Sequence, residues 1–415
     1  MSNKPIKTMI SLFSGAGGLD LGLSTAGFTN KLCVEIDHIA RKTLVLNHAK
    51  WKLSCPGDIH ALTPAELMKQ AGLKPKELTL LAGGPPCQPF SKSGYWVTGD
   101  TDRLTDPRAK TLKAYLDIVR EALPQVILLE NVKGIAFSEK DEGLKLLLNE
   151  LNSINKAKKT NYKPHVIVIN AADYGVPQSR ERVFIIASRD GKQFNLPVAT
   201  HFDPSIVKNT KYPHRTAWDA IGDLDVDIWP DEVKPSGKWG DLLPTIPEGQ
   251  NYLWHTEQSG GLALFGWRTR FWSFLLKLAK DKPSWTIQAQ PGPATGPFHW
   301  KGRLLSIREL ARLQTFPDDY KFVGDRRSAH KQIGNAVPPA IGEFFGLEIR
   351  RQFFGERVRK QLKLIPEKRN NCPSPEKPKD VPKKYLTLVG THDAHPGTGK
   401  GPAAQKREQK EHIYA

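Results

Sequence analysis

The sequence predicts an α/β protein built on a doubly wound, Rossmann-like parallel sheet, with a smaller loop-rich domain placed after it. Short apolar, β-rich runs alternate with amphipathic stretches up to about residue 190, and this rhythm then stops. Continuous apolar runs are typical of strands that are covered on both faces. The expected strands are Thr8–Phe13, Lys31–Ile36, Leu78–Ala82, Gln125–Glu130, His165–Asn170 and Val183–Ala187.

A change in composition marks the expected domains. Residues 191–305 hold eight of the ten tryptophans among many prolines and glycines, which indicates a separate module. A helical pattern returns at Ser306–Leu313, and Pro338–Phe354 is typical of a helix that packs back onto the sheet. The expected divisions are a first domain at 1–190, the module at 191–305, a return segment at 306–358 that completes the first domain, and a mobile basic tail at 359–415.

The charge balance favours a polyanionic partner. The chain has 61 Lys and Arg against 43 Asp and Glu, a net charge of +18, and nucleic acid is the simplest such partner. Charge alone does not separate DNA from RNA. The chain shows neither an apolar run of signal length at its N-terminus nor eighteen consecutive apolar residues, so we expect a soluble, cytoplasmic protein. The four cysteines form no CxxC pair, and no metal site is expected.

A glycine-rich loop, Phe13–Gly18, follows the first expected strand and opens a helix. Its glycines allow a ligand to approach the backbone at a helix N-terminus. Glu35 ends the second strand, at the position where an acidic side chain holds ribose hydroxyls. Together they predict a nucleoside cofactor, although NAD fits them as well as S-adenosylmethionine, and a lone glycine loop is also a common tight turn. Asp58 is suited to an adenine amino group, and equally to an ordinary turn.

The most specific local pattern is the run Gly83–Ser91, which reads GGPPCQPFS and follows an apolar strand. Its prolines and glycines fix an irregular loop, which places the thiol of Cys87 at the carboxyl edge of the sheet, where open α/β folds bind ligands. A lone cysteine is more often a small buried apolar residue. Cys87, however, stands in a loop that no core requires.

Three charged side chains are expected near this loop. Glu130 ends the next strand, and strands adjacent in sequence are often adjacent in space, so Cys87 and Glu130 should face one pocket. Arg180 and Arg182 lead into the strand Val183–Ala187, and alternation would send them to the same side. Each also has an ordinary interpretation, as a helix cap or solvated loop residue for the glutamate and as a surface pair for the arginines.

As an ordered set, these motifs resemble the cytosine-C5 DNA methyltransferase family. The resemblance covers about residues 8–190 and 306–345. It implies that 191–305 is a target-recognition domain. Ile36 stands where many relatives carry an aromatic ring, and the tail after Lys360 has no counterpart in the family pattern. The motifs are FSGAGG at 13–18, PPCQPFS at 85–91, DPR at 106–108, ENV at 130–132, QSRER at 178–182, RELARLQ at 308–314 and QIGNAVPP at 332–339.

The resemblance implies transfer of a methyl group from S-adenosylmethionine to C5 of a cytosine flipped out of double-stranded DNA. Cys87 would attack C6, Glu130 would serve N3, Arg182 would serve O2, and Arg180 would orient Glu130 or the adduct. The loop Ser91–Asp106 would close over the base. Contacts to nucleic acid are expected from Gln88, Ser91, Ser93, Arg108 and Gln178.

The cofactor pocket implied by the resemblance draws on both halves of the catalytic domain. Its expected residues are Phe13, Ser14, Gly15, Ala16, Gly17, Gly18, Leu19, Glu35, Ile36, Asp58, Ile59, Gly84, Pro86, Asn335 and Ala336. A dehydrogenase would leave the cysteine loop without a role, whereas a tRNA methyltransferase would use the same chemistry and remains the alternative. We further expect a monomer of a prokaryotic restriction-modification system, with a cognate endonuclease that acts separately.

Overall fold

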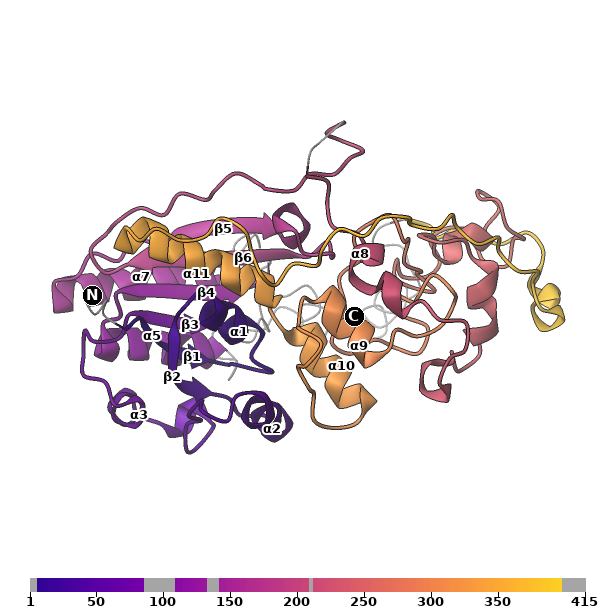
Figure 1. Cartoon of the computed structure of the whole chain (residues 1–415). Coiled ribbons are helices and arrows are strands. Elements are labelled where there is room, and N and C mark those ends of the chain that lie inside the picture. The colour runs from indigo at the N-terminus through magenta and orange to yellow at the C-terminus, as the bar shows by residue number, and fades with distance from the viewer. Residues whose placement is uncertain (1–5, 86–108, 133–141, 209–211, 398–415) are drawn as a thin grey trace, which may run out of the picture.

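The computed structural model describes residues 6–85, 109–132, 142–208 and 212–397. Figure 1 shows a body built on a β-sheet and, beside it, a second body made mostly of loops. The yellow C-terminal segment runs from the first body to the far side of the second. Among the described residues, no helix is long and apolar enough to cross a membrane.

The sheet has six strands in the order β2-β1-β3-β4-β6-β5. Its strands match the six predicted apolar runs, but the prediction of a wholly parallel sheet is wrong for β6, which is antiparallel to both of its neighbours. The link from β5 to β6 spans only 171–180, too short for a parallel crossover. The strands are β1 (Thr8–Leu12), β2 (Thr29–Val34), β3 (Leu80–Gly83), β4 (Val126–Asn131), β5 (His165–Asn170) and β6 (Glu181–Ser188).

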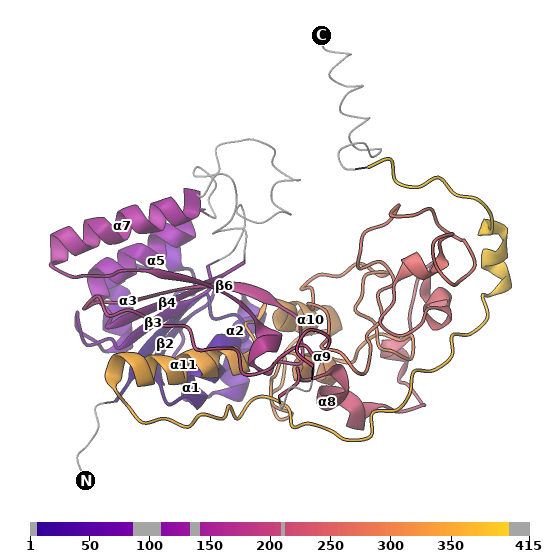
Figure 2. The same ribbon diagram turned by 90° about the horizontal axis from the view of Figure 1, so that it is seen from above.

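Helices cover both faces of the sheet (Figure 2). Ile127 and Leu129 of β4 face one cluster, while Val126 and Leu128 face the other. This double coverage explains why the strands read as continuous apolar runs. The first face packs against α3 (Pro64–Ala71), α5 (Ala109–Ala122) and α7 (Glu142–Lys158), and the second against α1 (Gly18–Thr25) and α11 (Pro339–Phe354).

The return segment behaves as its sequence predicts. Ser306 caps α9 (Ile307–Leu313) in a capping box with Glu309, and α10 (Arg326–Asn335) follows. The helix α11 then packs on α1, so closely that a Cβ on Gly22 would lie 2.1 Å from the carbonyl oxygen of Pro339. The first and last parts of the body that holds the sheet are thereby joined, although the module separates them in sequence.

Within its described residues, the module 191–305 contains short helices and isolated bridges but no strand. Aromatic rings provide much of its core. Phe265 packs edge-on against Tyr252 and Phe274, with centroid distances of 5.8 and 5.9 Å. Its helices are α8 (Ala217–Ile221) and the 3-10 turns η3 (Gly222–Leu224), η4 (Asp231–Val233), η5 (Gly240–Thr245) and η6 (Tyr252–His255).

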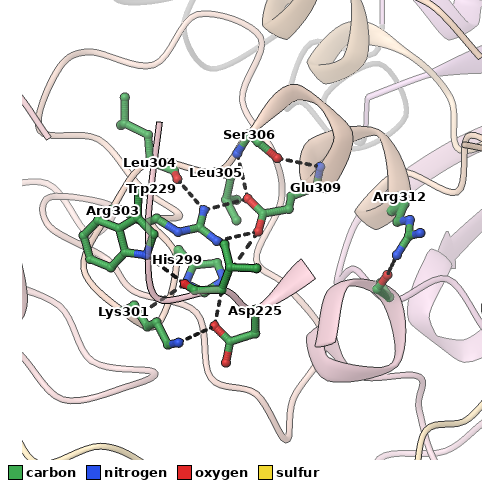
Figure 3. A network of polar contacts seen from close by, with 12 residues as sticks. Asp225, Trp229, His299, Lys301, Arg303, Leu304, Leu305, Ser306, Glu309 and Arg312 are labelled. Atoms are coloured by element: carbon green, nitrogen blue, oxygen red, sulfur yellow. Dashed lines mark hydrogen bonds and ion pairs between the residues drawn. The ribbon is translucent and has the colours of Figure 1, made fainter. Parts of the chain in front are cut away.

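A buried ion pair fixes the point where the chain leaves the module (Figure 3). Both Nη atoms of Arg303 donate to the carboxylate of Glu309 at 2.7 Å, and the two side chains are almost completely buried. The backbone N–H of Ser306 donates to the same carboxylate. A bidentate, charge-assisted pair of this kind holds its geometry strongly, so it sets the direction in which α9 begins.

Parts of the predicted mobile tail at 359–415 differ from that prediction, because they pack against both bodies. The buried carboxylate of Glu343 in α11 accepts hydrogen bonds from the backbone N–H groups of Lys363 and Leu364. Further on, Tyr385 is only 3% exposed, stacks on Trp239 and donates a hydrogen bond to the carbonyl of Lys238. An extended segment that packs through scattered side chains has no apolar periodicity, and its sequence therefore resembles a tail. Residues 398–415 lie outside the described residues.

The docked segment predicts a measurable contribution of Tyr385 to stability. Replacing the buried ring with alanine leaves a cavity and should lower the free energy of unfolding of the module by about 3 kcal/mol. Tyr385→Phe keeps the ring and loses one hydrogen bond, so its effect should be about 1 kcal/mol. Urea unfolding of the full chain, followed by tryptophan fluorescence, measures both. Equal stability of the alanine variant and the parent would show that the segment does not dock in solution.

Candidate active site

The predicted site residues gather at one edge of the sheet. The parallel strands β1, β2 and β3 end there and are followed by Phe13, Glu35 and Gly84. The parallel strand β4 ends at the same edge and contains Glu130 as its second-to-last residue. Because β6 is antiparallel, it begins at this same edge and brings Arg182 beside the end of β4. Open α/β sheets bind their ligands at this edge.

The glycine-rich loop leaves one position open. Gly17 and Gly18 are needed for packing, since a Cβ would lie 2.8 Å from Leu44 and 2.3 Å from the carbonyl oxygen of Val337, respectively. Gly15 has φ +55°, and a Cβ built on it would meet no atom within 4 Å. Its backbone N–H donates to Glu35 Oε2 at 2.6 Å. A ligand can therefore approach the backbone at Gly15, beside a carboxylate and just before α1.

Glu35 is held as a nearly buried carboxylate. Its second oxygen, Oε1, accepts a hydrogen bond from the backbone N–H of Asp37 at 2.7 Å. Burial raises the pKa of Glu35, while the N–H donors of Asp37 and Gly15 oppose that rise. The neighbouring side chain of Ile36 is 70% exposed. A fixed acceptor next to an exposed apolar side chain suits a nucleoside. The ribose hydroxyls would donate to Glu35, and the base would pack on Ile36.

Among the remaining predicted pocket residues, Asp58 caps a turn, whereas Ser14, Leu19 and Ile59 are buried. Asp58 accepts a hydrogen bond from the backbone N–H of His60 at 2.9 Å and so caps the turn η1 (Ile59–Ala61). Ile59 and Leu19 are buried in the two cores of the sheet. Ser14 is also almost buried, and its hydroxyl donates to Ser11.

The return segment closes the back of the glycine-rich loop. Ala336 is buried, and its side chain would lie 3.1 Å from a Cβ on Gly18. Asn335, the last residue of α10, is exposed. The hydroxyl of Tyr320 donates to the carbonyl of Ala16 at 2.6 Å. The contact at Gly18 places Ala336 against the loop, whereas the part of Asn335 in the pocket stays a prediction.

The cysteine loop begins next to Glu130. A Cβ on Gly84 would lie 3.0 Å from Glu130 Oε2, and Asn131 Nδ2 donates to the carbonyl of Pro85 at 3.2 Å. The chain therefore enters the loop beside the carboxylate. Cys87 itself lies outside the described residues, as do Pro86, Gln88, Ser91, Ser93 and Arg108.

Glu130 and Arg182 form an ion pair at the mouth of this edge. Arg182 Nε lies 3.0 Å from Glu130 Oε1, and the side chains are 13% and 17% exposed. Burial raises the pKa of Glu130, and the charges of Arg182 and then Arg180 act against the rise. A carboxyl group whose pKa is raised by burial, with a cation beside it, is suited to share a proton with a bound group.

Two predicted roles are corrected by the structure. Gln178 is fully buried, donating to Leu313 and Gln314 and accepting from the N–H of Ile287, so its side chain cannot reach DNA. Arg180 is also buried. It donates to the carbonyls of Ile287, Gly334 and Ala336 rather than to Glu130, on which it acts only through its charge. The predicted alternation fails because β6 begins at Glu181, after Arg180.

Sequence reasoning missed three residues that hold the site together. Asn131 anchors the start of the cysteine loop, and its place in the ENV motif was an available signal. Tyr320 fixes the glycine-rich loop, with no pattern around it to indicate this. Gln314 donates to the carbonyls of Ile333 and Ala336 while accepting from Gln178, and thus joins the QSRER and QIGNAVPP motifs.

Comparison with known proteins agrees with this geometry. Residues 7–351 match the family model of C-5 cytosine-specific DNA methylases. The Type II methyltransferase M.SacI of Streptomyces achromogenes is 40% identical over 362 residues, covering 81% of this chain and 90% of that protein. The Type II methyltransferase M.NgoFVII of Neisseria gonorrhoeae is 33% identical over 342 residues, covering 81% of this chain and 84% of that protein.

The fold is shared with solved structures as well. A protein from Escherichia coli, described as a prophage-encoded DNA modification methyltransferase, superposes with a TM-score of 0.57 at 23% identity and covers 84% of this chain and 99% of that one. The family description names DNA, which decides against the tRNA alternative. With its sheet, its glycine-rich loop and its Glu130–Arg182 pair arranged at one edge, the chain belongs to the family of C-5 cytosine-specific DNA methylases and is a DNA cytosine-C5 methyltransferase.

Proposed function

We propose that this enzyme methylates a cytosine flipped out of a specific duplex sequence, through a covalent bond between Cys87 and C6 of the base. The observation that carries the proposal is the partly buried Glu130–Arg182 pair, which stands where the chain enters the cysteine loop. The pair offers a carboxyl group and a guanidinium to one small site. A cytosine ring that enters this site presents N3 to the first and O2 to the second.

The proposed chemistry follows from the low electron density at C5 of cytosine, which must attack the methyl group. Carbon 5 of cytosine is a weak nucleophile, and the S–C bond formed by the Cys87 thiolate at C6 moves the ring electrons toward C5. Glu130 shares a proton with N3, and Arg182 donates to O2, so that the charge gained by the ring is neutralised. C5 would then form a bond to the methyl group as the S–CH₃ bond of the donor breaks and a neutral thioether is released. A base would remove the C5 proton, and the electrons of the C5–H bond would expel the Cys87 thiolate from C6. Attack from above the ring plane requires a flipped base.

S-adenosylmethionine is the methyl donor that we propose for this site, and it supplies an electrophilic methyl group. Glu35 would bind the ribose hydroxyls, Ile36 would cover the adenine and Asp58 would accept from its amino group. The open backbone at Gly15 leaves space for the amino-acid part at the start of α1. Asn335 and Ala336 would complete the pocket from the return segment.

The division of labour between the two bodies is also a proposal. Residues 1–190 and 306–358 would carry out the chemistry, and 191–305 would recognise the target sequence. The Type II names of the relatives support a role in protecting DNA from a restriction endonuclease that acts separately. We propose that the enzyme works on double-stranded DNA as a monomer in the cytoplasm of a prokaryotic cell.

Glu35→Gln should weaken binding of S-adenosylmethionine by about tenfold or more, because one charged acceptor is replaced by an amide whose NH₂ faces the same donors. Calorimetric titration of the protein with the cofactor measures the change. Asp190→Asn provides a control, since Asp190 pairs with Lys192 just after β6 ends, at the opposite edge of the sheet. Unchanged cofactor affinity in Glu35→Gln would remove Glu35 from the pocket.

Glu130→Gln should lower turnover by about 100-fold or more with little change in cofactor affinity, because the lost proton acts on the adduct rather than on the bound cofactor. Turnover on saturating DNA is the measurement. Glu150→Gln removes the carboxylate of another Arg–Glu pair, 2.9 Å from Arg120 and away from this edge, and should leave turnover unchanged. Near-normal turnover in Glu130→Gln would exclude the proposed proton role.

DNA with 5-fluorocytosine at the target should trap the enzyme in the presence of S-adenosylmethionine. Fluorine cannot leave C5 as a cation, so the S–C bond should persist through denaturing electrophoresis, with the linked peptide containing Cys87. Cys87→Ser should form no such complex, because a hydroxyl is far less acidic than a thiol. Complete methylation of the fluorinated site without trapping would rule out the proposed adduct.

A further inference from the structure

An exposed stretch of the module carries both basic and aromatic side chains. Residues 268–272 read RTRFW and are exposed throughout, with Phe271 at 54% and Trp272 at 56%. The guanidinium of Arg270 lies 5.8 Å from the centroid of the Phe274 ring. Large apolar side chains that gather at the surface beside arginines are typical of binding surfaces.

The backbone of this stretch is held from below by buried polar side chains. Asn251 Nδ2 donates to the carbonyl of Trp272 at 2.8 Å. The hydroxyl of Tyr252 donates to the carbonyl of Arg270 at 2.9 Å and accepts from its N–H at 3.1 Å. Asn251 and Tyr252 are 2% and 1% exposed. A fixed backbone that presents exposed side chains lowers the entropy cost of binding a partner.

A second stretch completes the surface. The Trp285 ring is 40% exposed and packs edge-on against Trp272 with a centroid distance of 5.7 Å. Gln288 Nε2 donates to the hydroxyl of Ser273 at 3.2 Å. We call the resulting set the aromatic surface; it consists of Arg268, Arg270, Phe271, Trp272, Trp285 and Gln288.

The aromatic surface is tied by the backbone to the catalytic edge. Ser284, next to Trp285, exchanges hydrogen bonds with Pro177 and Ser179 at 2.9 and 2.8 Å. The hydroxyl of Thr286 donates to the carbonyl of Ser179 at 2.7 Å. From Ser179, the chain reaches Arg182 within three residues, about 10 Å of extended chain. The aromatic surface and Arg182 are therefore connected through a short, hydrogen-bonded stretch of chain.

We propose that the aromatic surface contacts the DNA duplex beside the flipped cytosine and reads the flanking bases. The proposal rests on the proposed function of residues 191–305. Arginine pairs with two acceptors of guanine, and a glutamine amide pairs with adenine, so Arg268, Arg270 and Gln288 supply base-reading groups. Trp272 and Trp285 supply the faces and edges that pack on sugars and on the bases exposed by the departed cytosine.

The test compares binding to target and scrambled duplexes by fluorescence anisotropy, after bisulfite sequencing of DNA methylated by the parent enzyme has identified the target. Trp272→Ala should weaken target binding tenfold or more and scrambled binding less than twofold. Arg270→Lys keeps the charge but loses the planar fork, so it should keep affinity for scrambled DNA while losing discrimination. Trp272→Phe should retain most of the target affinity.

Two control variants lie in the same module. Ile228 is 90% exposed and Lys208 is exposed, and alanine at either position should leave both affinities unchanged. Because all substituted side chains are exposed, melting temperatures should match that of the parent, and so should cofactor binding. Unaltered discrimination in both Trp272→Ala and Arg270→Lys would overturn the proposal. Failure of the proposed function differs visibly, because the parent enzyme itself would then form no trapped complex with fluorinated DNA.

Discussion

The buried guanidinium of Arg180 is the constraint on which the arrangement of the two bodies depends. It lies just before β6 and donates to the module at Ile287 and to the return segment at Gly334 and Ala336. A buried cation without these carbonyl partners would cost several kcal/mol. The three segments must therefore meet around it, and Ala336 in turn supports the glycine-rich loop at Gly18. One side chain thus couples the positions of the module, the glycine-rich loop and the strand that carries Arg182.

The sequence predicts those parts of the fold that a run of apolar residues or a helix-capping motif marks directly. Six apolar runs become six strands, and Ser306 begins a helix as its capping box indicates. The reversed direction of β6 depends on the length of the link before it, which the apolar pattern does not express. The docking of Tyr385 depends on one ring in an irregular segment, and a composition that resembles a tail conceals it.

The site shows the same division. Glu130 meets the start of the cysteine loop because β3 and β4 are neighbours both in sequence and in space. Gln178 and Arg180 were misplaced because they precede the strand, where alternation no longer holds, and pair instead with 284–287. The aromatic surface escaped prediction altogether. Its side chains come from irregular loops, whose shape is determined by buried residues such as Asn251 and by no period in the sequence.

The docked C-terminal segment also constrains how such an enzyme can change its target during evolution. Tyr385 packs among Trp239 and its neighbours, so the core of the module 191–305, which we propose recognises the target, is encoded by two distant parts of the gene. Recombination that replaces only 191–305 would bring in a new aromatic core. That core would then have to pack against Tyr385 of the old chain, which did not evolve with it. A gene of this kind should exchange specificity most readily when the crossover also carries its 3′ end, so that the two coding regions are inherited together.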